Sequence, residues 1–243
     1  MPATFAQLTE SLETQLTRLQ EWLEPLGEYL AGQAQQPSSL PGWTVRELVV
    51  HIGGCLDTLI DSYPAPAGTH PLTLAEYLGT YPNRAEEISE LTHAKATELT
   101  TPLNEFLDAQ HSKLTAKLAQ LGDDEELVIQ GRRGPIELRD IVLSRLIELV
   151  VHALDLEASL AGRVDMSAGN KPIDKPALDI VADELLSIVV ARGGQPLDIV
   201  HPSLWVRLAT GRLPYNTDQL ALALNPTHTA GGIPDLGRML PLL

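Results

Sequence analysis

The chain has 243 residues, 44% of them hydrophobic, which is enough for one or two domains with buried cores. Its 17 basic and 32 acidic side chains give a formal net charge of −15, which argues against nucleic acid and anionic membranes as partners. The single cysteine, Cys55, excludes an intrachain disulfide, a four-cysteine zinc site and a CxxC redox pair, and it favours a reducing compartment.

The chain also lacks sequence signals for export or membrane insertion. Residues 1–10 contain no basic stretch followed by an apolar core, so no secretory signal is expected. The longest apolar runs are interrupted by Glu148, His152 and Asp155 and fall short of the roughly 20 residues that span a bilayer. We therefore expect a soluble, cytoplasmic protein.

The first two thirds of the chain are expected to be helical, because apolar residues recur at helical spacing behind helix-start signals. The first helix is predicted over about 4–30, with Gln7 three residues after Thr4 at its start.

Two further helices follow. One is predicted over about 44–62, because Thr44 and Glu47 can form a capping box. The next is predicted over about 84–121, and it must bend or restart near Pro102 because proline removes a backbone donor inside a helix.

The fourth main helix is predicted over about 138–160. Before it, residues 127–136 contain Gly131 and Gly134, which suggest a small β-hairpin. A short extra helix is expected within 72–81. Four such helices with a long excursion between the second and third favour a bundle whose interior can hold a site.

A shift in charge marks an expected domain boundary. Residues 1–161 carry 24 acidic and 10 basic side chains, whereas residues 162–243 carry 8 and 7. The shift falls at Gly162, before a polar, turn-rich stretch over 165–175 that is typical of a linker. We predict an α+β fold with a four-helix bundle over 1–161 and a small α/β domain over 162–243.

The second domain is predicted to mix helices and strands. Helices are expected over 176–192 and 203–209, and strands near 197–200 and 219–224.

Two candidate metal ligands lie on the fourth helix. Glu148 and His152 are four residues apart, so both side chains project from one face, as two ligands of one metal would. With Arg145 and Asp155 they form a polar stripe on an otherwise apolar helix, and a solvated outer face would have the same pattern.

His51 is the third candidate ligand. It lies within the apolar stripe of the second helix formed by Leu48, Ile52, Cys55 and Leu59, so it faces the bundle interior. One interpretation is a core histidine bonded to a backbone carbonyl or to Glu148. If the second and fourth helices are neighbours, the three side chains supply two nitrogens and a carboxylate, which is a ligand set of catalytic zinc with one open position.

These residues stand in motifs that resemble a known family. The segment Leu40-Pro41-Gly42-Trp43-Thr44 precedes Leu48 and His51, and the fourth helix reads Arg145-x-x-Glu148-x-x-x-His152-Ala153-x-Asp155-Leu156. Shorter matches are Arg84-x-Glu86-Glu87-Ile88, Gln130-Gly131-Arg132 and Ala209-Thr210-Gly211-Arg212. Together they resemble the mycothiol-dependent maleylpyruvate isomerase family of actinobacteria, within the DinB-like bundle superfamily.

The resemblance implies a divalent metal, usually zinc, held by His51, Glu148 and His152, with water or the thiolate of mycothiol in the fourth position. The thiolate would add to an activated double bond or displace a leaving group, as in an isomerase or S-transferase. Arg212 matches the family's arginine near the site and suits a substrate carboxylate, which its planar fork binds bidentately. Arg84 is a second candidate for that contact, with a surface ion pair as the alternative.

Departures from the family leave the substrate open. Cys55 stands where many members have asparagine, either as a small buried hydrophobe or as a residue that tunes the site. Asp155 either orients His152 or is a surface carboxylate. Trp43 is expected to be a structural plug. The tail over 231–243 resembles a sterol-carrier-like subgroup.

The leading hypothesis is therefore a metal-dependent, mycothiol-using isomerase or S-transferase acting on a small electrophilic substrate, for which a carboxylate group is one option. A second hypothesis is a non-catalytic protein whose C-terminal domain carries a lipid or other apolar ligand, motivated by the apolar segment 220–224. A third is a metal-binding protein with a role in interaction or stress response.

Overall fold

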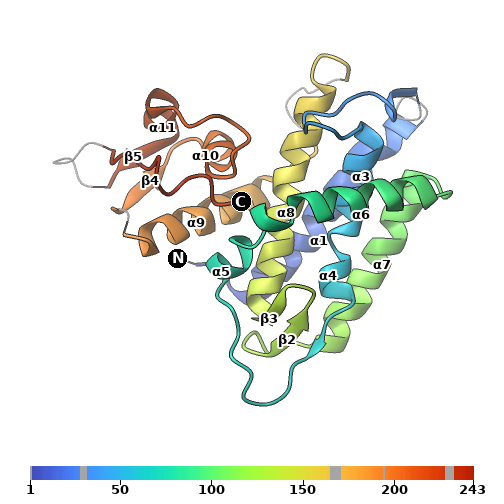
Figure 1. The fold of residues 1–243 in the computed structure, drawn as a ribbon, viewed down its shortest axis with the longest axis horizontal. Helices are drawn as coiled ribbons and strands as arrows, with labels where there is room; N and C mark the ends of the chain where they lie inside the picture. The colour runs from blue at the N-terminus through green and yellow to red at the C-terminus, as the bar shows by residue number, and fades with distance from the viewer. Residues whose placement is uncertain (1, 28–31, 165–170, 194, 228–232) are drawn as a thin grey trace.

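The computed structural model describes residues 2–27, 32–164, 171–193, 195–227 and 233–243. Over these ranges the chain is mainly helical, with two small antiparallel sheets, so the predicted α+β class is confirmed (Figure 1). None of the helices in these ranges combines the length and hydropathy needed to cross a membrane.

Four helices form the bundle in the first part of the chain: α1 (Phe5–Leu23), α3 (Val45–Gly54), α7 (Leu103–Leu121) and α8 (Leu138–Leu160). The last of these, α8, is the central helix of the molecule, because 19 of its 23 residues are buried. It packs against α1, α3 and the C-terminal helices α9 (Lys175–Ala191) and α10 (Pro202–Ala209). Any polar side chain on α8 is thereby drawn into the interior.

The first helix begins as predicted but ends early. Thr4 and Gln7 form a reciprocal capping box at its start. Regular α-helix stops at Leu23 and gives way to a 3₁₀ turn, η1 (Glu24–Leu26), which contains a proline that cannot supply a backbone donor. The predicted end at Leu30 lies outside the described residues.

The second predicted helix is broken in two. Its capping box of Thr44 and Glu47 is present, but α3 ends at Gly54 and a short helix, α4 (Asp57–Ile60), follows. The carbonyl of Cys55, at the break, accepts a hydrogen bond of 2.8 Å from the guanidinium of Arg145 on α8. The interruption therefore gives a buried cation a backbone partner.

The third predicted helix restarts at Pro102, as expected. The 3₁₀ turn η2 (Pro82–Arg84) leads into α6 (Ala85–Glu98), and Pro102 is the N-cap residue of α7. Figure 1 shows α6 running across the bundle, where it packs on α3. The predicted extra helix is also present, as α5 (Leu74–Leu78).

The predicted hairpin lies directly before α8. Strands β2 (Val128–Gly131) and β3 (Gly134–Glu137) pair antiparallel, and β1 (Tyr63–Pro64) adds to β2. Gly131 pairs with Gly134, so Arg132 and Arg133 form the turn. Gly134 has a φ of +126°, which only glycine adopts readily.

The C-terminal part agrees with prediction in three elements and differs in one. Helices α9 and α10 and strand β4 (Leu197–Ile199) lie where expected. The strand predicted over 219–224 is wrong: the chain forms α11 (Thr217–Ala223) and then β5 (Leu224–Pro226), which pairs with β4.

Local capping explains this difference. The side chain of Asn216 accepts hydrogen bonds from the backbone N–H groups of Asp218 and Gln219, which starts a helix. Leu220 and Ala223, one turn apart, are buried. The apolar segment that motivated the lipid-carrier hypothesis thus contributes side chains to the core.

The C-terminal part packs directly on the bundle, and one hydrophobic cluster runs through both. Buried Gln15 of α1 donates to the carbonyl of Pro172 and accepts from the N–H of Asp174, which ties the second part to the first. Near the other end, the N–H of Leu242 donates to the carbonyl of Ala209 and brings the C-terminus beside α8 (Figure 1). The boundary at Gly162 stays a prediction, and residues 165–170 of the predicted linker are not described.

Candidate metal centre

The structure brings the three predicted ligands together. Glu148 and His152 lie one turn apart on α8, and His51 reaches them from α3. Their three ligand atoms lie within 4.8 Å of one another, and Glu148 and His152 are buried. The interpretation of the α8 stripe as a solvated outer face is therefore wrong, and the predicted inward orientation of His51 is confirmed.

Asp155 orients the imidazole of His152. The Nδ1 of His152 lies 2.9 Å from the carboxylate of Asp155, and its Nε2 lies 3.1 Å from Oε2 of Glu148. Burial by itself lowers the pKa of His152, but the hydrogen bonds to the two carboxylates outweigh it, and the pKa is raised. Because Asp155 accepts from Nδ1–H, Nε2 is the atom left to face Glu148.

A threonine on α6 performs the same task for His51. The hydroxyl of Thr92 donates to the carbonyl of Ile88 at 2.8 Å, so its oxygen accepts from Nδ1–H of His51 at 3.2 Å. The Nε2 of His51 then faces Oε2 of Glu148 at 3.6 Å. Burial lowers the pKa of His51 to about 4, so the ring is neutral at pH 7 and offers a lone pair on Nε2.

Glu148 supplies the negative charge of the cluster. Burial opposes its ionisation, but hydrogen bonds from His152 and His51 and the charge of Arg145 hold its pKa well below the ordinary range. Arg145 is fully buried and donates to the hydroxyl of Tyr81 at 2.7 Å as well as to the Cys55 carbonyl. Two Nε2 atoms and an ionised carboxylate converge on one point, which suits a divalent metal with an open position.

A cavity of about 410 Å³ adjoins this cluster, within the size range of small-molecule sites. It is lined by the three cluster residues and by Trp43, Tyr81, Val151, Arg212 and Leu243 among others. The Trp43 ring meets that of His51 edge-on, with centroids 4.9 Å apart, and its Nε1–H donates to the hydroxyl of Ser89 at 3.0 Å. Trp43, predicted as a plug, forms a wall of this cavity.

Arg212 lies at the same cavity but already has a carboxylate partner. Its guanidinium contacts the Asp155 carboxylate at 3.2–3.3 Å. Asp155 thus joins Arg212 to His152, and the charges of both hold its pKa below the ordinary range against the effect of burial. A substrate contact for Arg212 remains a prediction.

Comparison with known proteins identifies the family and agrees with the fold. A model of the mycothiol maleylpyruvate isomerase N-terminal domain matches residues 12–157, more than half of the chain. The chain belongs to this family. No curated protein sequence matches the chain.

Two solved structures share the fold of this family member. They are crystal structures of the mycothiol-dependent maleylpyruvate isomerase and of a histidine-to-alanine mutant of it, with TM-scores of 0.55 and 0.56. Both are 15% identical to this chain, and each alignment covers 96% of this chain and 97% of the other. The shared fold therefore extends over the bundle and the C-terminal part together.

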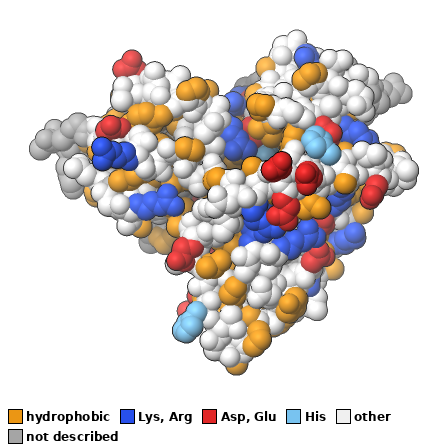
Figure 2. All heavy atoms as spheres, in the orientation of Figure 1, with side chains coloured by type: hydrophobic (Ala, Val, Ile, Leu, Met, Phe, Trp, Pro, Cys, Tyr) orange, Lys and Arg blue, Asp and Glu red, His pale blue; other side chains and the backbone are white. Residues whose placement is uncertain are grey.

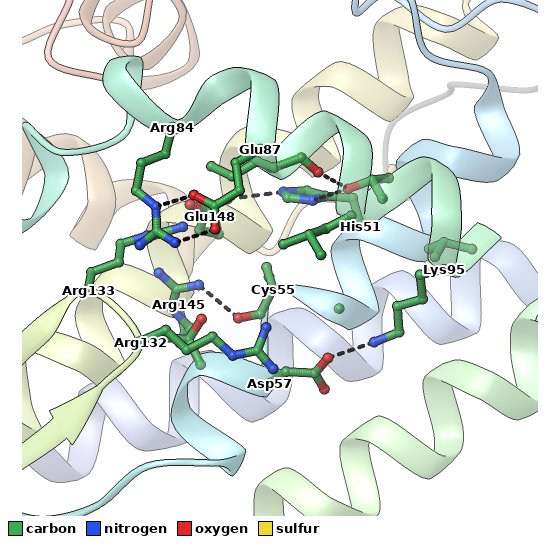
Figure 3. Close-up of a pocket in the computed structure, with 16 residues that line it drawn as sticks. His51, Cys55, Asp57, Arg84, Glu87, Lys95, Arg132, Arg133, Arg145 and Glu148 are labelled. Carbon is green, nitrogen blue, oxygen red and sulfur yellow. Dashed lines mark hydrogen bonds and ion pairs between the residues drawn. The ribbon is translucent and has the colours of Figure 1, made fainter. Parts of the chain in front are cut away.

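A second, smaller cavity of about 100 Å³ also borders the cluster of His51, Glu148 and His152. His51 and Glu148 line both cavities. The second cavity contains Arg84, which forms a bidentate ion pair with Glu87 as the alternative interpretation expected (Figure 3). Other cations line it too: Lys95, Arg132, Arg133 and Arg145. Figure 2 shows Lys and Arg side chains gathered between α6 and the hairpin.

Cys55 also lines this second cavity, but its thiol is not a reactive nucleophile. It is buried, and burial together with the charge of Glu148 raises the pKa of its thiol to about 12. The thiol donates to the carbonyl of Ile52 at 3.1 Å. These contacts fit the predicted small buried hydrophobe, and the protein's own sulfur is protonated at neutral pH.

Sequence reasoning missed three residues at the site. Thr92 and Tyr81 belong to segments without distinctive spacing, and only packing brings them to His51 and Arg145. No motif in the sequence indicates that Arg133 belongs to the site, although Arg133 adjoins the Gly131-Arg132 motif. The predicted hairpin was the usable signal, since it places Arg133 in a turn directly before the helix that carries the cluster.

Proposed function

We propose that this protein is a metal-dependent isomerase or S-transferase that uses a low-molecular-weight thiol, mycothiol, on a small electrophilic substrate. The observation that carries the proposal is the buried cluster of His51, Glu148 and His152 beside the larger cavity. Family membership supports it, because the matched family is described by mycothiol and maleylpyruvate isomerase.

The donor set fits zinc. Two neutral imidazole nitrogens and one carboxylate form a catalytic zinc site with one position left for water or substrate. Each histidine has its Nδ1–H bound elsewhere, by Thr92 or Asp155, so both rings present Nε2 to Glu148. His51, Glu148 and His152 would hold the zinc ion, which would supply Lewis acidity that lowers the pKa of a nearby thiol.

The remaining residues of the site orient the metal-binding side chains and enclose the cluster. Asp155 keeps the His152 ring in one tautomer, and Arg212 holds that carboxylate in place. Trp43 covers the edge of His51 and narrows access of water to the cluster. The cavity of about 410 Å³ is within the size range of small-molecule sites and opens beside the cluster.

The state of Cys55 supports an external thiol. Its thiol is protonated near neutral pH, because its pKa is about 12, and it sits in the second cavity rather than in the larger one. Thiol chemistry at the cluster thus needs sulfur from a cosubstrate.

Metal analysis tests the proposal. Protein purified without a histidine tag should contain about one zinc per chain, and His51→Ala and Glu148→Gln should lose it. His93→Ala is the matched control, since His93 contacts Glu47 and Ser89 instead of the cluster. Equal metal content in all four proteins, or none in the wild type, would contradict the metal assignment.

Thiol binding is tested separately on the cobalt-substituted protein. Mycothiol should change the visible absorption of the cobalt, because sulfur enters the coordination sphere of the metal. An unchanged spectrum together with no heat in a calorimetric titration would remove the thiol from the proposal.

A further inference from the structure

The second cavity is basic in a strongly acidic protein. Five cations line it, namely Arg84, Lys95, Arg132, Arg133 and Arg145, against three carboxylates, Asp57, Glu87 and Glu148. Figure 3 shows the four arginines along one side of the cavity and Lys95 on the other. In a chain of net charge −15, cations gathered this closely repel one another and need nearby anions or hydrogen-bond acceptors to stabilise them.

Most of these cations have a carboxylate partner. Arg84 pairs with Glu87 at 2.8 Å, Lys95 with Asp57 at 2.6 Å, and Arg132 with Asp61 at 2.7 Å.

Buried Arg145 is compensated differently. It has neutral hydrogen-bond acceptors in the Cys55 carbonyl and the Tyr81 hydroxyl, and its charge interacts with that of Glu148. With a contact from Nε to the Ser144 hydroxyl, each of its three nitrogens donates a hydrogen bond within the protein.

Arg133 differs from the other four. It forms no hydrogen bond or ion pair with any residue that the structure describes, and its Nη1 is buried without a partner. Its guanidinium carbon lies 3.9 Å from the centre of the Tyr81 ring and 5.4 Å from that of Tyr77. The two rings hold the guanidinium plane while leaving its N–H donors unused.

One of these two tyrosines carries a second unsatisfied polar atom. Within the described ranges, the hydroxyl of Tyr77 and Nη1 of Arg133 are the two buried side-chain polar atoms that lack a hydrogen-bond partner. Buried polar groups in folded proteins are nearly always paired, so an orphaned guanidinium on a cavity wall indicates a missing acceptor.

We propose that Arg133 binds a carboxylate group of the substrate in this second cavity, which shares His51 and Glu148 with the larger cavity lined by Trp43 and Arg212. The inference rests on the proposed function in one respect, namely that the molecule bound is the substrate of the metal cluster. It makes Arg133 a binding residue for a carboxylate of that substrate.

A carboxylate suits the cavity in shape and charge. Its two oxygens match the parallel N–H groups of a guanidinium. One negative charge balances Arg133, the one cation of these five that has no hydrogen bond or ion pair with a described residue, whereas a phosphate dianion would bring a second negative charge toward Asp57, Glu87 and Glu148. A volume of about 100 Å³ admits a compact group of a few heavy atoms, with the rest of the substrate in the larger cavity.

Calorimetric titration of maleate, a small dicarboxylate, tests the proposal. Maleate should bind to wild-type protein, and Arg133→Gln should weaken it at least tenfold. Arg139→Gln is the matched control, because Arg139 does not line this cavity and pairs with Glu125, and it should change binding by less than twofold.

Three results would overturn the assignment: no maleate binding to the wild type, equal weakening in both variants, or tighter binding of inorganic phosphate than of maleate. If Arg133→Gln fails to fold by circular dichroism, Arg133→Lys replaces it, since lysine keeps the charge but lacks the planar fork. That variant should bind maleate several-fold more weakly, and wild-type affinity in it would contradict bidentate recognition.

Titrations with and without metal separate this inference from the proposed function. If metal and thiol bind but the affinity for maleate is the same in Arg133→Gln as in the wild type, the proposed function stands and the inference fails. If metal does not bind but maleate binding still depends on Arg133, the carboxylate site stands and the metal-dependent function fails.

Discussion

Replacing Asp155 by asparagine should weaken metal binding without unfolding the protein. The Asp155 side chain is 3% exposed and lies between Nδ1 of His152 at 2.9 Å and the guanidinium of Arg212 at 3.2–3.3 Å. An asparagine oxygen can still accept from Nδ1–H, but it brings no negative charge to the imidazole. The ring becomes a poorer donor at Nε2, and Arg212 loses its ion pair.

The size of the effect follows from the position of Asp155 behind a ligand. Loss of such a carboxylate typically lowers metal affinity about 10–100-fold, or roughly 1.4–2.7 kcal/mol. We expect the upper half of that range, because Asp155 is buried and no described acidic residue besides Asp155 and Glu148 contacts His152.

Competition with a chromogenic chelator measures this affinity. Glu157→Gln is the control, since it makes the same carboxylate-to-amide change two residues along α8, where Glu157 pairs with Lys171 and Arg207. The control should bind zinc within about threefold of wild type, with both variants folded by circular dichroism. An Asp155→Asn protein with wild-type zinc affinity would refute the role assigned to Asp155.

Three further outcomes follow from the structure. Because the pKa of Cys55 is about 12, only about one part in ten thousand of its thiol is ionised at pH 8. Cys55 should therefore react with Ellman's reagent only after the protein is unfolded, and prompt labelling of the native protein would contradict its burial. Gly53→Ala should lower the free energy of unfolding, measured in urea, by about 1–3 kcal/mol, because the added Cβ overlaps the Phe106 ring. Gly54→Ala is the control: its Cβ meets only the flexible side chain of Lys95 at 3.4 Å, so the substitution should be neutral or stabilising. Metal affinity should fall as the pH drops from 7.5 to 5.5, since the raised pKa of His152 lets protons compete for Nε2; a pH-independent cobalt spectrum would argue against histidine ligation.

Much of the fold could be predicted from local signals. The capping box of Thr44 and Glu47, the restart at Pro102, the Gly131–Gly134 hairpin and the full extent of α8 all stand where the sequence places them. Each depends on a few neighbouring residues, and local rules of capping, turns and periodicity describe such features well. The strand predicted over 219–224 failed because an apolar run suits a strand or a short helix equally until its capping residue is weighed.

The candidate site divides in the same way. Spacing on one helix and one inward histidine are local properties, so His51, Glu148 and His152 could be named as a ligand set from the sequence, and the structure brings them together. Their partners could not be named, because Thr92 comes from α6 and Arg212 from the C-terminal part.

The single cysteine and the charge of −15 were plain from the sequence, as was the concentration of that charge in residues 1–161. Only the tertiary structure decided that Cys55 is buried with a raised pKa and that Arg212 already has a carboxylate partner. It alone left Arg133 without one. The physical reason is that pairing and desolvation depend on which distant segments share a cavity wall, and no local pattern along the chain encodes that contact.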